Sequence, residues 1–216
     1  AEGQEIIVTG TRRNDLTAAD SPTPIDIISS AELLNQGTSD VNDILRQEVP
    51  SLNVQRFTSN DGSVFTRPYS LRGLPPDQTL VLVNGKRRHR GATVQLSNIP
   101  YIRGSQGPDL ATIPSIAIGQ LEVLRDGDSA NYGSDAIAGV LNFRLRTERD
   151  GATIIARYGQ FYEGDGKDYL LQGNVGLPFT DQGFVNISAE YNRSGITSRQ
   201  NQRPDAQALI DQGVQG

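Results

Sequence analysis

The sequence predicts an α+β domain, a small mixed sheet with short helices, followed by a stretch of antiparallel strands. Two observations support this division. Up to about residue 147, short apolar runs alternate with helix-capping and turn residues. From about residue 150, runs of roughly ten residues place apolar and polar side chains alternately, most clearly at 185–192.

The composition excludes several classes of function. The chain has 216 residues and a net charge of −5, so a general nucleic-acid surface is not expected. It has no cysteine, which excludes disulfide bonds, zinc ribbons and thiol catalysis. Its one histidine, His89, cannot build a histidine-rich metal site. No run reaches the roughly 20 apolar residues that a membrane-spanning helix needs.

The first clear unit begins at Pro24. Alternating side chains predict a strand at 24–28. Ser29 and Glu32 form a capping box for a helix at 30–36. Gly37 is expected to end this helix.

A second helix and three further strands are expected before residue 86. Ser39 is predicted to cap a helix at 40–48, and a strand follows at 52–56. Two more strands are predicted at 69–72 and 79–83. The turn that follows them, Asn84-Gly85, is the strongest hairpin signal in the chain. The segment 91–114 shows no periodicity and is expected to be a long loop.

Residues 118–143, IGQLEVLRDGDSANYGSDAIAGVLNF, organise the rest of the chain. A strand is predicted at 118–124, and a second apolar run covers 140–145. The segment between them is filled mostly by Gly, Ala and Ser, so the backbone there must approach something closely.

This stretch resembles the end of the plug domain of TonB-dependent outer-membrane transporters. In that family a strand, an Arg-Gly turn, a Tyr-Gly pair and a Gly-Val strand follow in the same order. Arg72-Gly73 and the strand-turn at 81–85 match the family in order and spacing. One departure is Asp126-Gly127, where the family commonly has Gly-Pro after the signature arginine.

The resemblance implies three regions. Residues 1–23 form an N-terminal segment with a candidate TonB box, and residues 24–147 form an α+β plug domain. Residues 148–216 are the first three strands of an antiparallel transmembrane β-barrel with an outer loop. Runs of alternating residues also occur in soluble β-sandwiches, but together with the plug signature they favour a barrel.

The connections between the runs suit a barrel. A compact turn at 178–183 is expected on the periplasmic side, and the longer polar segment after residue 195 outside, with a short helix at 204–212. Three strands cannot close a barrel, because an open edge in lipid leaves backbone groups unpaired. We therefore expect the remainder of the barrel to be missing from this chain.

The function implied by the resemblance is energy-coupled import of a scarce ligand, such as a ferric siderophore, across the Gram-negative outer membrane. The plug gates the barrel, and neither catalysis nor a cofactor is involved. The implied partners are the periplasmic domain of TonB with its inner-membrane motor, outer-membrane lipid and the small-molecule ligand; nucleic acid is not among them. The alternative is a soluble β-rich binding or adhesion module.

Two groups of site residues follow from the resemblance. The TonB-binding segment matches Glu5, Ile6, Ile7, Val8, Thr9 and Gly10, which pair as an added strand. The same run also fits the first edge strand of the plug. Arg72 and Arg125 match plug arginines that pair with barrel-wall carboxylates, with Glu122 as an alternative local partner. They also fit ordinary surface arginines.

The remaining site residues lie in loops. Ligand contacts in the family match Arg56, Phe57, Arg88, His89, Arg90 and Tyr101. A cationic loop suits an anionic ligand, although generic loop charge explains the basic run equally well. The turn glycines of the plug match Gly73, Gly85, Gly127, Gly133 and Gly139, and they permit rearrangement. A hydrolase would need His89 as a base, which its cationic neighbours disfavour.

Overall fold

The computed structural model describes residues 24–56, 63–96, 100, 102–125, 129–181, 183–197 and 203–213. The chain divides into two compact units: Ala1–Ile154 with Gln172–Glu190, and Ile155–Leu171 with Tyr191–Gly216. Among the described residues, no helix combines the length and apolar character required to cross a membrane.

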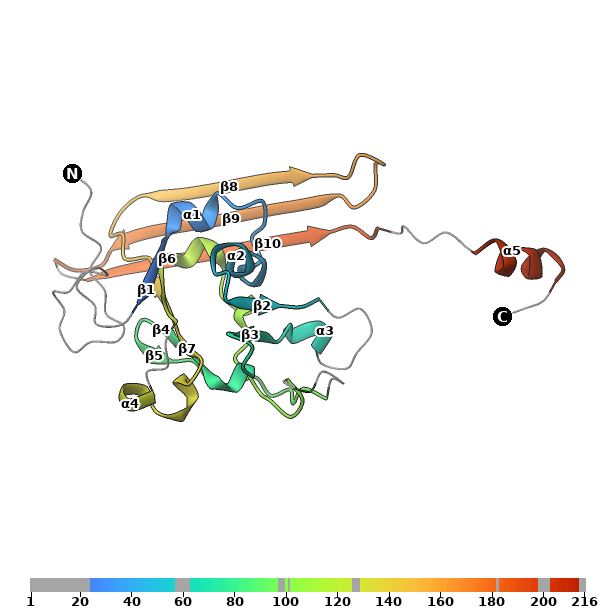
Figure 1. Ribbon diagram of the computed structural model, residues 1–216. Helices are drawn as coiled ribbons and strands as arrows, with labels where there is room; N and C mark the ends of the chain where they lie inside the picture. Colours follow the sequence, from blue (N-terminus) through green and yellow to red (C-terminus); the bar gives the residue numbers. More distant parts are fainter. Residues whose placement is uncertain are drawn as a thin grey trace. The chain divides into compact units, whose positions relative to one another are not determined.

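The centre of the first unit is a five-stranded mixed sheet (Figure 1). Its strands, in the order in which they lie in the sheet, are β1 (Ile25–Ser29), β6 (Ile118–Leu124), β7 (Gly139–Leu145), β4 (Thr79–Val83) and β5 (Lys86–Arg87). β4 and β7 are parallel, and the other pairs are antiparallel. This arrangement confirms the predicted α+β class with a small mixed sheet.

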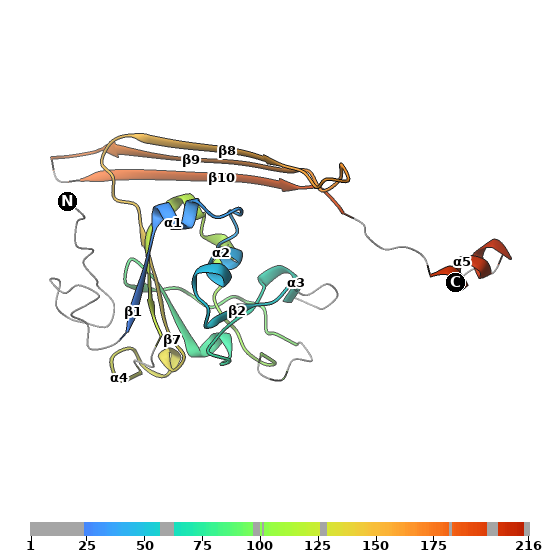
Figure 2. The same ribbon diagram turned by 45° about the horizontal axis from the view of Figure 1, so that its top comes forward.

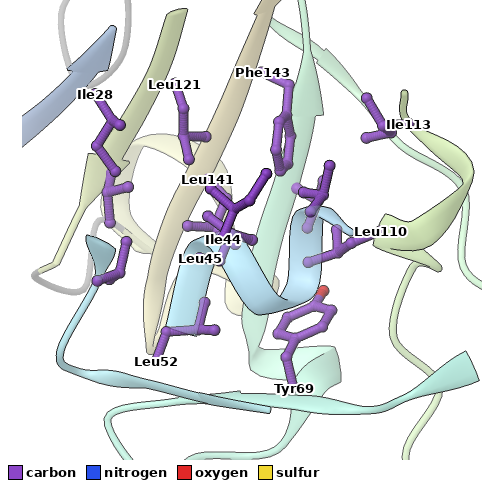
Figure 3. Packing of buried hydrophobic residues seen from close by; sticks show 14 of the residues in the cluster. Ile28, Ile44, Leu45, Leu52, Tyr69, Leu110, Ile113, Leu121, Leu141 and Phe143 are labelled. Atoms are coloured by element: carbon purple, nitrogen blue, oxygen red, sulfur yellow. The ribbon is translucent and has the colours of Figure 1, made fainter. Parts of the chain in front are cut away.

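Both faces of the sheet are buried at β1, β6, β7 and β4, because residues of each of these strands enter two different apolar clusters. Leu141 and Phe143 of β7 belong to the larger cluster, whereas Val140 belongs to the smaller one. Figure 3 shows the larger cluster, in which Ile44 and Leu45 lie beside Leu141. This packing fixes the strand register, since a slip of one residue would exchange the two faces.

Two helices contribute to the larger cluster. These are α1 (Ser30–Leu34) and α2 (Val41–Glu48), drawn beside the sheet in Figure 2. The predicted capping box is confirmed: Ser29 N donates to Glu32 Oε2 at 2.7 Å, and Glu32 N donates to Ser29 Oγ at 3.3 Å. The Ser29 hydroxyl also donates to Glu32 Oε2 at 2.8 Å, and the two hydrogen bonds that the carboxylate accepts, from Ser29 N and from Ser29 Oγ, lower the pKa of Glu32.

Two of the expected helix boundaries are wrong. The first helix ends at Leu34 and not at residue 36. The cap of the second helix is Asp40 and not Ser39, because Asp40 Oδ1 accepts a hydrogen bond of 2.9 Å from Asn42 N. Ser and Asp are both favourable N-cap residues, so the residue preferences do not decide which of these two neighbours caps the helix.

A two-stranded sheet pairs β2 (Leu52–Val54) with β3 (Tyr69–Leu71). Both strands end before the predicted residues 56 and 72. The remaining elements of this unit are short, and they are α3 (Ser63–Thr66), η2 (Pro76–Gln78), η3 (Leu110–Thr112), η4 (Ser115–Ala117), α4 (Ser129–Tyr132) and η5 (Ser134–Ala136). η3 therefore lies within the predicted long loop at 91–114, where a 3₁₀ turn of three residues leaves no periodic signal.

The three predicted antiparallel strands are present as β8 (Ala152–Gly159), β9 (Asp168–Pro178) and β10 (Phe184–Ser194), in the sheet order β10-β9-β8 (Figure 2). In β9 the polar residues Gln172 and Asn174 are buried, and Leu171 and Leu177 are exposed. A water-soluble sheet shows the opposite pattern, and buried polar residues that alternate with exposed apolar ones are typical of a strand in a transmembrane barrel.

The second unit ends with helix α5 (Pro204–Asp211), close to the predicted 204–212. Gly213 follows with φ of +80°, and its N–H donates to Ile210 O at 2.9 Å. This glycine is the predicted stop of the helix.

Candidate functional site

Arg72 and Gly73 form a tight turn after β3. Their φ angles are +56° and +76°, and Leu71 is bridged to Leu74 across the turn. A left-handed conformation costs a non-glycine residue about 1–2 kcal/mol. Strained residues of this kind concentrate at functional sites, so Arg72 stands out in the structure as it did in the sequence.

Arg125 lies beside this turn, because Arg72 Nη1 donates to Arg125 O at 2.9 Å. The Arg125 guanidinium binds both carboxylate oxygens of Asp26: Nη2 lies 2.9 Å from Oδ1, and Nε lies 2.8 Å from Oδ2. The structure thus brings together the two arginines that the family resemblance singled out. Asp26, which the sequence did not single out, joins them because β1 pairs with β6.

Glu122, the predicted alternative partner of these arginines, has two polar partners on β7. Glu122 is fully buried in β6 opposite Asn142 of β7. Its carboxylate accepts from Asn142 Nδ2 at 3.0 Å and from Arg144 Nη1 at 3.5 Å. The carboxylate that binds Arg125 is Asp26, and the role of Glu122 as an alternative local partner of the two arginines stays a prediction. The register of β6 against β7 places Glu122 opposite Asn142, and a local sequence pattern does not predict this register.

Asp135, an acidic residue of the segment 118–143, anchors the basic run that follows Gly85. Arg87 and Arg90 both pair with Asp135, and Arg87 Nη2 also donates to Tyr132 O at 3.1 Å. Together with His89, these side chains line a pocket of about 180 Å³. Asp135 offsets part of the positive charge that motivated the ligand-binding prediction. That prediction for Arg88, His89 and Arg90 stays a prediction.

Arg56, the fourth cationic candidate, belongs to an ion-pair cluster that we call the Asp43 cluster. It consists of Asp40, Asp43, Arg56 and Arg67. Arg67 pairs with both aspartates, with Nη2 2.6 Å from Asp43 Oδ1, and Arg56 pairs with Asp43. Burial acts to raise the pKa of Asp43, but hydrogen bonds from Arg67 and Arg56 outweigh it and hold the pKa below its ordinary value.

Two of the predicted turn glycines have a clear steric reason. Asn84 and Gly85 have φ of +50° and +74°, the type I′ geometry predicted for this hairpin. Gly139 has φ of +148°, and a Cβ at this position would lie 2.3 Å from Leu124 O. No other residue fits there without displacing β6. Gly73 and Gly133 also have positive φ.

The inner face of β9 carries a polar network within the first unit. Gln172 Nε2 donates to Glu190 Oε2 at 2.7 Å and to Ser115 Oγ of η4 at 2.8 Å. Asn174 Nδ2 donates to Ser188 Oγ at 2.8 Å. The sequence placed these residues on the polar side of the strands but did not predict that one of them reaches the plug segment.

Several predicted site residues lie outside the described residues. They are Glu5, Ile6, Ile7, Val8, Thr9, Gly10, Phe57, Tyr101 and Gly127. Within the described part of the chain, no three His, Cys, Asp or Glu side chains come close enough to hold a metal ion together.

Comparison with known families gives one match over more than half of the chain. The TonB-dependent Receptor Plug Domain family matches residues 17–140. Among similar proteins, the iron-regulated outer membrane virulence protein of Vibrio cholerae is 36% identical over 129 residues, which cover 60% of this chain and 18% of that protein. The vitamin B12 transporter BtuB of the same species is 27% identical over 87% of this chain and 28% of its own length.

Two solved structures share the fold. The siderophore receptor PirA of Acinetobacter baumannii aligns with a TM-score of 0.61 at 23% identity, over 79% of this chain and 24% of that receptor. A mutant (R480A) of the ferric enterobactin receptor PfeA of Pseudomonas aeruginosa aligns with a TM-score of 0.62 at 20% identity, over 80% of this chain and 25% of that receptor. The chain therefore spans less than a third of each of these proteins.

Proposed function

Because this chain belongs to the TonB-dependent Receptor Plug Domain family, we propose that it forms the plug and first wall strands of a transporter that imports a small-molecule ligand. Its location is the outer membrane of a Gram-negative bacterium, in agreement with the relative that is named an outer membrane protein. The observation that carries the proposal is the inverted burial of β9, which follows a plug-family segment in the same chain. A strand with buried amides and exposed leucines suits a wall between lipid and a polar lumen.

The proposed role of the plug is to close the lumen and to reopen it at the expense of energy delivered by TonB. Residues 5–10 are the proposed TonB contact, because a short β-branched run can pair as an added strand. β1, the first strand after this segment in the sequence, begins at Ile25 and stands at the edge of the five-stranded sheet. No step of this function requires catalysis.

The ligand class that we propose is a ferric siderophore. The 36%-identical relative is named for regulation by iron, and both structural neighbours are siderophore receptors. The basic segment around His89 adds positive potential, although Asp135 offsets part of it. The relative that matches 87% of the chain is named a vitamin B12 transporter, so cobalamin is the competing ligand to be tested.

Uptake by cells tests this proposal. The complete receptor is expressed in a strain that lacks its own siderophore and cobalamin receptors, and uptake of radiolabelled ferric siderophores and of labelled cobalamin is compared. We expect siderophore-dependent uptake that disappears when residues 5–10 are deleted. Deletion of six residues at 11–16 is the matched control and should preserve uptake.

Three results would contradict the proposal. Uptake that persists in a strain without TonB would remove the energy coupling. Cobalamin uptake without siderophore uptake would replace the ligand class. A receptor that is monodisperse in water without detergent would favour the soluble binding-module alternative.

A further inference from the structure

A cleft of about 470 Å³ lies within the first unit, between the turn after β4, the η3–η4 segment and the start of β10. Ligand sites typically have volumes of about 300–1,000 Å³, so the cleft can hold a small molecule. The polar side chains that line it are Asn84, Arg88, Thr112, Arg146, Thr147, Asn186 and Ser188. Ile113, Pro114 and Phe184 provide apolar wall.

The charged side chains that line the cleft are positive. Arg88 and Arg146 are its charged residues, and no carboxylate is found among the described residues that line it. This distinguishes it from the pocket beside His89, where Asp135 pairs with two arginines. An apolar wall lowers the local dielectric and strengthens the attraction between two guanidinium groups and an anion.

Arg88 is held in place for such a contact. Its Nη2 donates to Thr112 Oγ1 at 3.0 Å, and the Thr112 hydroxyl donates to Asp109 O at 2.8 Å. The hydroxyl therefore accepts from the guanidinium and is anchored to η3 at the same time. Because Arg has five N–H donors, the other donors of Arg88 remain available to a ligand.

Arg146, which follows β7, also lines the cleft and is largely buried. Its side chain is 11% exposed, and its backbone N–H donates to Ala117 O at 2.9 Å. One guanidinium nitrogen, Nη1, lies 3.3 Å from Glu148 Oε1. The Glu148 side chain is half exposed and does not line the cleft, so this pair leaves the positive sign of the lining unchanged.

We propose that this cleft binds an oxyanion, namely a carboxylate or phosphate group of a small ligand, between Arg88 and Arg146. The inference rests on the proposed import function and adds a binding step on the exit side. Phe184 is the first residue of β10, directly after the compact turn at 179–183. Compact turns of outer-membrane barrels lie on the periplasmic side, so the site is at the end from which an imported ligand leaves.

Citrate is a suitable probe because it is small and carries three carboxylates. Its binding to the complete receptor, purified in detergent, is measured by saturation-transfer NMR and by competition with inorganic phosphate. We expect Arg88→Gln to weaken binding about tenfold, since it removes a charge-assisted hydrogen bond. Thr147→Asp adds a carboxylate to the lining and leaves both arginines in place, and we expect a similar loss.

The matched control is Lys86→Gln, which removes a positive charge from the same hairpin but not from the cleft. It should change citrate affinity less than twofold. Arg146→Gln should resemble Arg88→Gln, and unchanged hydrogen-exchange protection of β4 and β7 identifies a variant that is still folded.

Equal citrate affinity in the wild type, Arg88→Gln and Thr147→Asp overturns the inference, as does an equal loss in Lys86→Gln. Displacement of citrate by inorganic phosphate supports recognition of the oxyanion itself. Failure of phosphate to compete, with Arg88→Gln still weakening citrate, supports recognition of the carboxylate alone. Binding is measured without TonB, so loss of uptake on deletion of residues 5–10 tests the proposed function separately.

Discussion

Replacement of Asp43 by alanine tests whether the Asp43 cluster anchors α2. Asp43 and Arg67 have side-chain exposures of 8% and 11%, so their ion pair is buried. Removing one partner of a buried pair typically costs about 3–5 kcal/mol. Arg67 keeps Asp40 as a second partner, and Arg56 is 67% exposed and adds little. We therefore expect a loss of about 2–3 kcal/mol, at or below the lower end of that range.

Hydrogen exchange measured by mass spectrometry on the complete receptor reports this loss. Because each 1.4 kcal/mol is a factor of ten, the protection of α2 amides should fall by roughly 30- to 150-fold. Arg56→Gln is the matched control, since it breaks an exposed pair on the same carboxylate, and it should lower protection by no more than about fivefold. Equal effects of the two substitutions would refute the assignment of the energy to the buried pair.

The same cluster predicts a dependence on pH. The pKa of Asp43 is lower in the folded protein than in the unfolded chain, so the unfolded chain binds the proton more readily. The stabilisation is complete above the ordinary carboxyl pKa and is lost as the pH falls through the lower, folded pKa. After correction for intrinsic exchange rates, α2 protection in the wild type should decline over that acidic range. Asp43→Asn, which cannot titrate, should lack this part of the decline.

Three further substitutions test other parts of the structure. Phe143→Ala should destabilise the sheet by about 3–5 kcal/mol because its fully buried ring leaves a cavity, and exchange of β6 and β7 amides measures the loss. Gly139→Ala should reduce the amount of folded receptor in the outer membrane, since its Cβ meets Leu124 O at 2.3 Å; a wild-type level on quantitative blotting would contradict this. Gln172→Leu should cost about 1–3 kcal/mol by leaving a buried hydroxyl at Ser115 with one partner fewer, and a thermal unfolding midpoint equal to that of the wild type would rule this out.

Local features were predictable from the sequence because each depends on a few neighbouring residues. The capping box at Ser29 and Glu32 and the hairpin turn at Asn84-Gly85 are of this kind. The alternation after residue 150 is equally local, and in β9 it holds although Leu170 takes one of the buried positions otherwise filled by polar residues and glycine. Patterns with a period of two survive one such substitution, because the remaining positions still define the face.

The site was less predictable because its contacts join distant segments. Asp26 meets Arg125 across 99 residues of chain, and Asp135 meets Arg87 across 48. Neither acid lies in a motif that points to its arginine. Only the pairing of β1 with β6 brings Asp26 within reach, and strand order in a mixed sheet cannot be read from local periodicity. The family resemblance supplied the arginines but not their local partners.

Because β1 lies at the edge of the sheet, the resistance of the plug to force depends on which strand is pulled. A load applied to the chain before Ile25 first reaches the pair Ile25–Leu124 and the ion pair of Asp26 with Arg125. Peeled away from β6, an edge strand loses its hydrogen bonds one after another, so each step needs only a small force. β7 lies between β6 and β4, so a load on β7 must break its hydrogen bonds to both neighbouring strands at the same time. The same sheet is therefore weak when peeled from its N-terminal edge and strong at its centre.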